Sequence, residues 1–183
     1  LYDETIDELA TIAKGIKLGN GLDESTDLGP VNNRRQFERV LELVEDARQN
    51  GGNIAVGGER YGDKGYFVSP AIVSELGDDA RLVAEEQFGP ALPILPYREI
   101  DEVIDRANAG NFGLAASVWG PDKTQAAEIA QELDYGLVWV NQHLNIAPQV
   151  PIAGMKWSGI GVENGPWGLI EYTDLQVIEV AQG

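Results

Sequence analysis

Apolar residues recur along the chain at spacings that predict alternating helices and strands. Between residues 2 and 17 they return every three or four positions, the spacing of one helical face: Ile6, Leu9, Ala10, Ala13 and Ile16. A second stripe predicts a helix that starts after Val31 and ends at Gly51-Gly52, with an inner face of Phe37, Val40, Leu41, Val44 and Ala47. Two further helices are predicted, over residues 100–109 and from the N-cap residue Asp122 onward.

Short runs rich in apolar and β-branched residues predict strands between these helices. They cover residues 53–57, 66–74, 91–97, 114–119 and 137–140. Pro70 predicts an edge position or a bulge, because proline cannot donate a ladder hydrogen bond. After Asn141 the chain is predicted to be coil through Gly168, and residues 175–180 alternate enough to predict a final strand.

Apolar strands separated by helices are typical of a sheet that is covered on both faces. The predicted fold class is therefore α/β, a three-layer domain with a largely parallel sheet. No linker or repeat divides the chain, so residues 1–183 are predicted to form one domain. Because the first residue is Leu1 rather than methionine, we expect the chain to be processed or to begin inside a longer protein.

Composition excludes several classes of function. The chain has 13 Lys and Arg against 30 Asp and Glu, a formal net charge of -17 that would repel nucleic acid. This excess is either an ordinary solvated surface or an adaptation to salt. There is no cysteine and only one histidine, His143, so neither a disulfide nor a metal site is expected. No segment reads as a membrane span or a signal peptide, so we expect a cytoplasmic protein with no membrane partner.

The glycines Gly159, Gly161 and Gly165 could form a phosphate-binding loop. However, the last two are four residues apart rather than three, and no strand is predicted directly before them, which favours an ordinary turn. Ser158 has Lys156 where a nucleophile elbow needs glycine, and it is likewise interpreted as a turn residue.

Residues 85–90 (EEQFGP) place Glu85, Glu86 and Phe88 on a glycine-proline turn before a predicted buried strand. Loops that flank strands are where α/β proteins carry their sites. The alternative is an acidic surface turn with Phe88 in the core. His143 follows another buried strand, and it either faces a substrate or is a hydrogen-bonded structural residue.

Four motifs, in family order, resemble the aldehyde dehydrogenase superfamily: residues 85–90 (EEQFGP), 111–119 (NFGLAASVW), 136–141 (GLVWVN) and 151–165 (PIAGMKWSGIGVENG). Residues 1–31 are also similar to a family segment, so the resemblance covers nearly the whole chain and indicates the C-terminal, catalytic-domain part. It implies oxidation of an aldehyde to a carboxylic acid with NAD or NADP. In that family a cysteine attacks the aldehyde and a glutamate activates the hydrolytic water. Both precede the region matched by Leu1, so the fragment alone is expected to be inactive.

The resemblance also assigns roles to residues of this chain. It places the cofactor-ribose carboxylate on Glu86 and the aromatic ring beside the nicotinamide on Phe88. The loop after Asn141 would line the aldehyde pocket, with these substrate-facing positions: His143, Leu144, Ile146 and Ile152. Ile152-Ala153 stands where Phe-Gly is commoner, which leaves the shape of the pocket open.

The resemblance further implies a homo-oligomer in which the last strand reaches another subunit. The alternative is a non-catalytic partner or oligomerisation module of the same fold, which the absence of cysteine favours.

Overall fold

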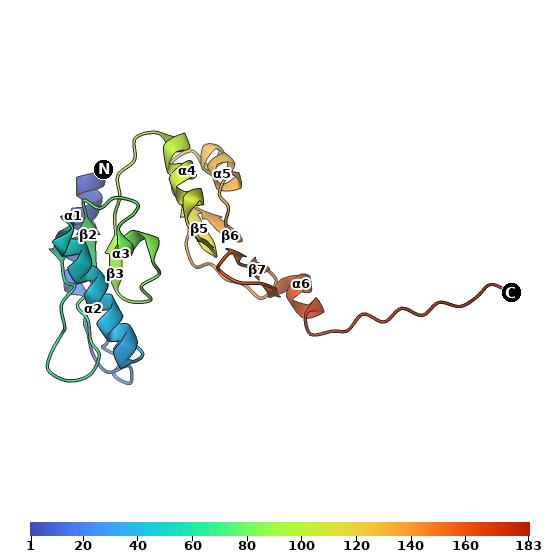
Figure 1. Cartoon of the computed structure of the whole chain (residues 1–183), viewed down its shortest axis with the longest axis horizontal. Helices are drawn as coiled ribbons and strands as arrows, with labels where there is room; N and C mark the ends of the chain where they lie inside the picture. Colours follow the sequence, from blue (N-terminus) through green and yellow to red (C-terminus); the bar gives the residue numbers. More distant parts are fainter. The chain divides into compact units, whose positions relative to one another are not determined.

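The structure, a computed structural model (Figure 1), describes all residues from 1 to 183 and contains two compact units, Leu1–Pro96 and Tyr97–Gly183. The sequence shows no composition change near Pro96, and this division was not predicted. That residues 1–183 belong to one domain stays a prediction. Each unit is described by itself.

The first unit is built on a three-stranded sheet. Its strands, in spatial order, are β1 (Asn53–Val56), β2 (Ala71–Ser74) and β3 (Ala91–Pro93). The central strand β2 pairs antiparallel with β1 and parallel with β3. Three helices belong to this unit: α1 (Tyr2–Gly15), α2 (Arg34–Gln49) and α3 (Arg81–Ala84).

Strand β2 is buried along its whole length, and its two faces contact different helices. Ala71 and Val73 belong to the core cluster that also contains the inner face of α2, whereas Ile72 packs with Ile6 and Ala13 of α1. Because successive side chains of a strand point to opposite faces, α1 and α2 cover opposite faces of the sheet. This is the predicted three-layer arrangement.

Two details of this unit differ from the sequence prediction. Pro70 marks neither an edge strand nor a bulge in its own strand: it lies just before β2, which is the central strand, and the irregular register falls between Ile54 and Val56 of β1. The buried face of α2 includes Leu43, which is fully buried, while Leu41 is only partly buried. Full burial of one such side chain contributes about 1.5–3 kcal/mol.

The second unit has a β-α-β unit at its centre, in which β5 (Ala115–Val118) and β6 (Leu137–Val140) pair in parallel. The connection is α5 (Lys123–Gln131), and the predicted cap is confirmed, because the Asp122 carboxylate accepts hydrogen bonds from the backbone N–H groups of Thr124 and Gln125. The helix α4 (Ile100–Ala109) precedes this unit and has the predicted bounds.

The rest of the second unit contains short elements that the sequence prediction missed. Where coil was predicted between Asn141 and Gly168, the structure has β7 (Ile152–Ala153), β8 (Met155–Lys156), β9 (Val162–Glu163) and the start of α6 (Gly165–Ile170). β7 pairs with β9, and β8 pairs with β4 (Phe112–Gly113), both antiparallel. These strands have two residues each, too few to show an alternating pattern.

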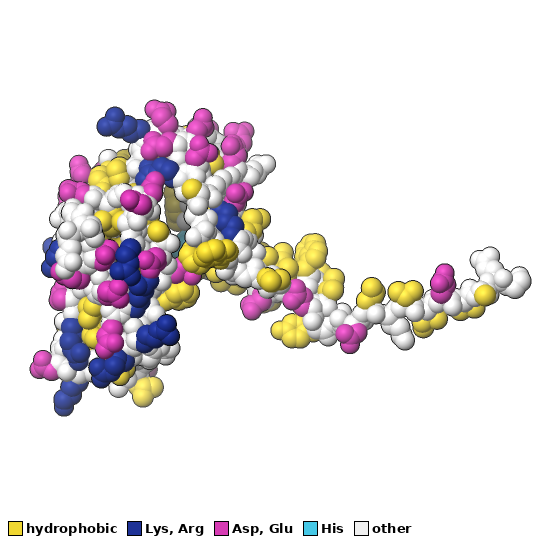
Figure 2. Space-filling model, viewed as in Figure 1, with side chains coloured by type: hydrophobic (Ala, Val, Ile, Leu, Met, Phe, Trp, Pro, Cys, Tyr) yellow, Lys and Arg dark blue, Asp and Glu magenta, His cyan; other side chains and the backbone are white.

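The predicted final strand at residues 175–180 has no partner strand within this chain. Residues 174–183 are extended and exposed, and Figure 2 shows hydrophobic side chains along this segment. The α/β fold class is confirmed, with parallel pairs in both units and antiparallel strands beside them. None of the helices is long and apolar enough to cross a membrane.

Candidate functional site

The turn between α3 and β3 carries the predicted cofactor residues, Glu86 and Phe88, in the first unit. The carboxylate of Glu86 is exposed and makes no hydrogen bond or ion pair. It borders an open hollow of about 530 Å³, whose other lining residues belong to the N-terminal half of α2 and its cap: Asn33, Arg35, Gln36, Glu38, Arg39 and Glu42. This hollow is lined by three carboxylates and two guanidinium groups, and of the carboxylates Glu38 and Glu42 are in ion pairs whereas Glu86 is not.

The neighbouring Glu85 is in a different situation, because both of its carboxylate oxygens are engaged. Arg81 Nε donates to Glu85 Oε1 at 2.8 Å, and Arg39 forms an ion pair with Glu85 Oε2. Arg81 also reaches Glu42 of α2 at 2.8 Å, and this contact raises the pKa of the Arg81 guanidinium above its ordinary value. Glu85 therefore ties α3 to α2, and Glu86 is the carboxylate left available.

Phe88 is not a core residue, and the core alternative weighed for it is wrong. Its side chain is 76% exposed, and its backbone has φ +46°. That conformation is uncommon for a residue with a Cβ atom, and observed strain of this kind is concentrated at functional sites. Next to it, Gly89 lies so close to α2 that a Cβ atom there would come within 2.3 Å of Val40 Cγ2. The turn is thus held against α2 while the ring of Phe88 faces solvent.

The loop after β6 carries three of the four predicted substrate residues, in the second unit. The ring of His143 packs edge-on against the buried ring of Trp139, with centroids 5.2 Å apart. Trp139 Nε1 donates to Asn145 O at 3.0 Å, and this hydrogen bond connects the loop to strand β6. Leu144 and Ile146 expose most of their side chains. The loop therefore presents an imidazole and two aliphatic side chains to solvent.

Ile152 lies apart from these three. It is half-buried in β7 and lines a hollow of about 650 Å³ formed mainly by residues 158–163 together with Glu171 and Tyr172. His143, Leu144 and Ile146 do not line this hollow. Within the second unit, three of the predicted substrate positions therefore lie on one exposed loop, whereas Ile152 lies in a hollow that these three residues do not line.

The glycine-rich turn is occupied by the chain's own groups. The backbone N–H of Val162, next to Gly161, donates to the Glu171 carboxylate at 3.1 Å. Ser158 Oγ accepts a hydrogen bond from the Gly113 backbone N–H at 2.9 Å. The three glycines have positive φ angles, which supports the interpretation as a turn. No group of three or more His, Cys, Asp or Glu side chains is placed to hold a metal ion.

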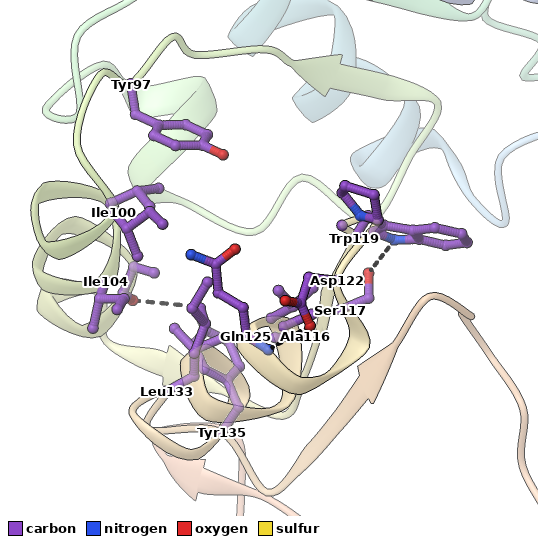
Figure 3. Close-up of a pocket in the computed structure, with 17 residues that line it drawn as sticks. Tyr97, Ile100, Ile104, Ala116, Ser117, Trp119, Asp122, Gln125, Leu133 and Tyr135 are labelled. Atoms are coloured by element: carbon purple, nitrogen blue, oxygen red, sulfur yellow. Dashed lines mark hydrogen bonds between the residues drawn. The ribbon is translucent and has the colours of Figure 1, made fainter.

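A third hollow, of about 390 Å³, lies between α4, α5 and β5 (Figure 3). Its walls include apolar residues of both helices, such as Ile104 and Ala126. Several of its polar groups are paired with one another or with the backbone: Trp119 Nε1 donates to Ser117 Oγ at 3.2 Å, and Tyr135 OH donates to Ala107 O at 3.2 Å. This hollow contains no nucleophile beside a base, and it is incompletely filled core rather than a reaction site.

Sequence reasoning missed two side chains that shape these loops, Gln36 in the first unit and Asn141 in the second. Gln36 Nε2 donates to the carbonyl oxygens of Gln87 and Phe88. Asn141 forms two hydrogen bonds with the backbone of Gly120, each 2.8 Å long. Their partners lie 51 and 21 residues away in sequence, so no local pattern could have identified them.

Comparisons with known proteins agree with the motifs. Residues 1–178 match the aldehyde dehydrogenase family. The chain is similar to aldehyde dehydrogenase 1A1 of Mesocricetus auratus, with 38% identity over 180 residues, 98% of this chain and 36% of that protein. It is 37% identical to retinaldehyde dehydrogenase 3 of Homo sapiens over 183 residues, all of this chain and 36% of that protein.

Solved structures give the same result. The NAD+ complex of an aldehyde dehydrogenase from Bacillus cereus superposes with a TM-score of 0.91 and 40% identity, over 94% of this chain and 35% of that chain. The chain thus spans little more than a third of the length of the relatives it matches. Since the family match covers nearly every residue and the fold agrees with it, the chain belongs to the aldehyde dehydrogenase family.

Proposed function

We propose that these residues form the C-terminal part of an NAD(P)-dependent aldehyde dehydrogenase that oxidises an aldehyde to a carboxylic acid. The family match and the solved NAD+ complex of a relative support this assignment. We also propose that the intact enzyme is cytoplasmic, as the name of a relative from Rattus norvegicus, "aldehyde dehydrogenase, cytosolic 1", indicates for that protein. It would be a homo-oligomer.

The observation that carries the proposal is the contrast between two adjacent carboxylates. Glu85 is fully engaged by Arg39 and Arg81, whereas Glu86 has no partner and borders the hollow beside α2. A free carboxylate can accept hydrogen bonds from both hydroxyls of a ribose. Glu86 therefore fits the ribose next to the nicotinamide of NAD or NADP.

Phe88 fits the same cofactor, because its exposed ring offers an apolar face two residues further along the turn. The bound dinucleotide would supply the ring that accepts a hydride from the substrate. Phe88 would restrict where that ring can lie, and Glu86 would orient the sugar attached to it. Such positioning accelerates a reaction because the reacting atoms are held at the correct distance before the chemical step.

The aldehyde pocket would be lined in part by His143, Leu144, Ile146 and Ile152. The first three are exposed on the loop after β6, and two of them are aliphatic. These side chains would exclude water from an apolar aldehyde. Because this chain has no cysteine, the thiol nucleophile and the glutamate base would come from the preceding part of the enzyme.

A second candidate function is a non-catalytic partner or oligomerisation module. The exposed apolar segment at residues 175–180 and the absence of cysteine favour it. The reading frame upstream of Leu1 separates the two candidates: a continuous frame that encodes the missing cysteine supports the enzyme, and a start codon directly before Leu1 supports the module.

The proposed cofactor role is tested by replacing Glu86 and Glu85 separately by Gln in the full-length enzyme. Glu86→Gln should weaken NAD+ binding or slow hydride transfer by about ten- to a hundredfold, because it removes a hydrogen bond to a charged group. Glu85→Gln is the matched control on the same turn, and it should mainly lower the unfolding midpoint by a small amount, since exposed ion pairs contribute little. If Glu86→Gln matched the parent in cofactor affinity and single-turnover rate, the surface-turn interpretation would stand.

A further inference from the structure

The turn that carries Phe88 is fixed by a side chain outside the four family motifs. The amide nitrogen of Gln36, in the first turn of α2, donates to the carbonyl oxygens of both Gln87 and Phe88, the latter at 3.4 Å. A primary amide has two N–H groups, so one side chain can serve two acceptors. No other side chain contacts these two carbonyl groups through a hydrogen bond.

The backbone of Phe88 explains how one amide can reach two consecutive carbonyl groups. In an extended chain successive carbonyl groups point to opposite sides, whereas in a left-handed conformation they point to the same side. Phe88 has φ +46°, so its own carbonyl and that of Gln87 can both be directed at α2. The hydrogen bonds from Gln36 are the ones that act directly on the two carbonyl groups whose relative direction the conformation of Phe88 sets.

Gln36 is itself held firmly. Its backbone N–H donates to the N-cap side chain of Asn33 at 2.9 Å, and its side chain is half-buried between α2 and the turn. The other fixed points of the turn are Gly89, which lies against Val40, and the side-chain amide of Gln87, which donates to Ala91 O. These fix where the turn lies, but only Gln36 acts on the carbonyl of Phe88.

We propose that Gln36 is a positioning residue that holds Phe88 in its left-handed conformation and so aims the exposed ring at the nicotinamide. The inference rests on the proposed function, since it deepens the role given to Phe88. Gln36 would orient Phe88, the residue that contacts the cofactor, through hydrogen bonds to two backbone carbonyl groups.

The test uses two substitutions in the full-length enzyme. Gln36→Met keeps the length of the side chain and removes the donor. Gln36→Glu keeps the shape almost unchanged but turns a carboxylate toward two carbonyl oxygens. Glu at the third position of a helix with an Asn N-cap is also favourable for the helix. A merely structural role therefore predicts that Gln36→Glu is harmless, whereas a positioning role predicts that it is the more damaging of the two.

We expect Gln36→Met to weaken NAD+ binding by roughly three- to tenfold, as the loss of one or two neutral hydrogen bonds would. Gln36→Glu should weaken it at least as much without lowering the unfolding midpoint. A readout that needs no cofactor is the fluorine NMR signal of 4-fluorophenylalanine at position 88, which should be one narrow line in the parent and broadened or multiple in both variants. The control Gln49→Met changes the same residue type at the other end of α2, where the amide donates only to Glu45, and should alter neither readout.

The two proposals fail separately. If Glu86→Gln and Phe88→Ala both left NAD+ affinity unchanged, the proposed function would be overturned whatever Gln36 does. If those two variants weakened binding, but the Gln36 variants kept the parental fluorine line or the parental affinity, only the positioning role of Gln36 would be overturned.

Discussion

Asn141 and Gly120 pair through two hydrogen bonds, in which the side chain of one residue acts as a substitute for backbone. Gly120 N–H donates to Asn141 Oδ1, and Asn141 Nδ2 donates to Gly120 O, each at 2.8 Å. The backbone N–H of Asn141 donates to Val118 O at 2.9 Å, so the side chain extends the β5–β6 pairing past the end of both strands. The loop that carries His143 and Leu144 starts from this point.

Replacing Asn141 by Ala should lower the free energy of unfolding by about 1–3 kcal/mol, because two hydrogen bonds are lost and their backbone partners are left half-buried. Alanine also tolerates the φ of +52° at this position less well than asparagine does. Denaturant unfolding measures the effect. The control is Gln149→Ala, an exposed residue on the same loop that should change stability by less than about 0.5 kcal/mol; equal losses in the two variants would contradict the role given to Asn141.

The helices α1, α2, α4 and α5 were predicted because their signal repeats several times within one element, whereas the short helices α3 and α6 were missed. Asp122 and the α4 stripe are examples: the cap and the apolar spacing are local, and local sequence contains them. The strands β7, β8 and β9 were missed because two residues cannot show an alternation, and their pairing joins distant positions such as Phe112 and Lys156. The boundary after Pro96 was missed because it is a change in contacts and not in composition.

For the candidate site, the sequence predicted where the residues lie but not their pairing or their backbone conformation. The motif places Glu86 and Phe88 on a turn before a strand, and the structure places them there. The resemblance assigned the cofactor role to Glu86, but the pairing that leaves Glu86 available could not be predicted, because Glu85 is engaged by Arg81 of its own helix together with Arg39 of another helix. The left-handed backbone of Phe88 was also unpredictable, because glycine is the residue that normally signals this conformation.

The isolated 183-residue chain should show no aldehyde oxidation with either dinucleotide. It has no thiol, and its best-placed hydroxyl, that of Ser158, accepts a hydrogen bond from Gly113 N–H and has no base beside it to remove its proton. Reduction of NAD+ or NADP+ by a series of aldehydes measures this directly. Steady turnover by the purified chain that disappeared on Ser158→Ala would overturn the prediction.

The second unit should lose stability at alkaline pH through Tyr135. Burial raises the pKa of the Tyr135 hydroxyl above its ordinary value of 10.0, so the folded state holds this proton more tightly than the unfolded state does. Its contribution to stability is therefore complete below about pH 10 and is lost as the pH rises through the higher folded-state pKa.

The comparison for Tyr135 is with Tyr135→Phe. This variant gives up the hydrogen bond to Ala107 O at all pH values but has no proton to lose, so its unfolding midpoint should fall less steeply than that of the parent above about pH 10. Tyr172→Phe, at an exposed position in the same unit, serves as the control. Parallel pH curves for the parent and Tyr135→Phe would show that burial of this hydroxyl does not matter.

The terminal segment should cause the protein to self-associate. Leu175, Val177, Ile178 and Val180 are all more than three-quarters exposed and have no partner in this chain. An extended apolar segment with free backbone N–H and C=O groups is a template for pairing with the sheet edge of another chain. Deleting residues 174–183 should therefore shift the protein toward a monomer in light scattering over a range of concentrations.

A matched pair of variants separates apolar pairing from a general effect of the tail. Leu175→Ser with Val177→Ser removes two apolar side chains, and Gln176→Ser with Glu179→Ser changes two polar positions of the same segment. If the apolar side chains drive pairing, only the first pair should weaken association. With about 1.5–3 kcal/mol for each buried aliphatic side chain, the dissociation constant should rise by at least tenfold. A strict monomer at high concentration, unaffected by the deletion, would remove the basis for this role of the segment.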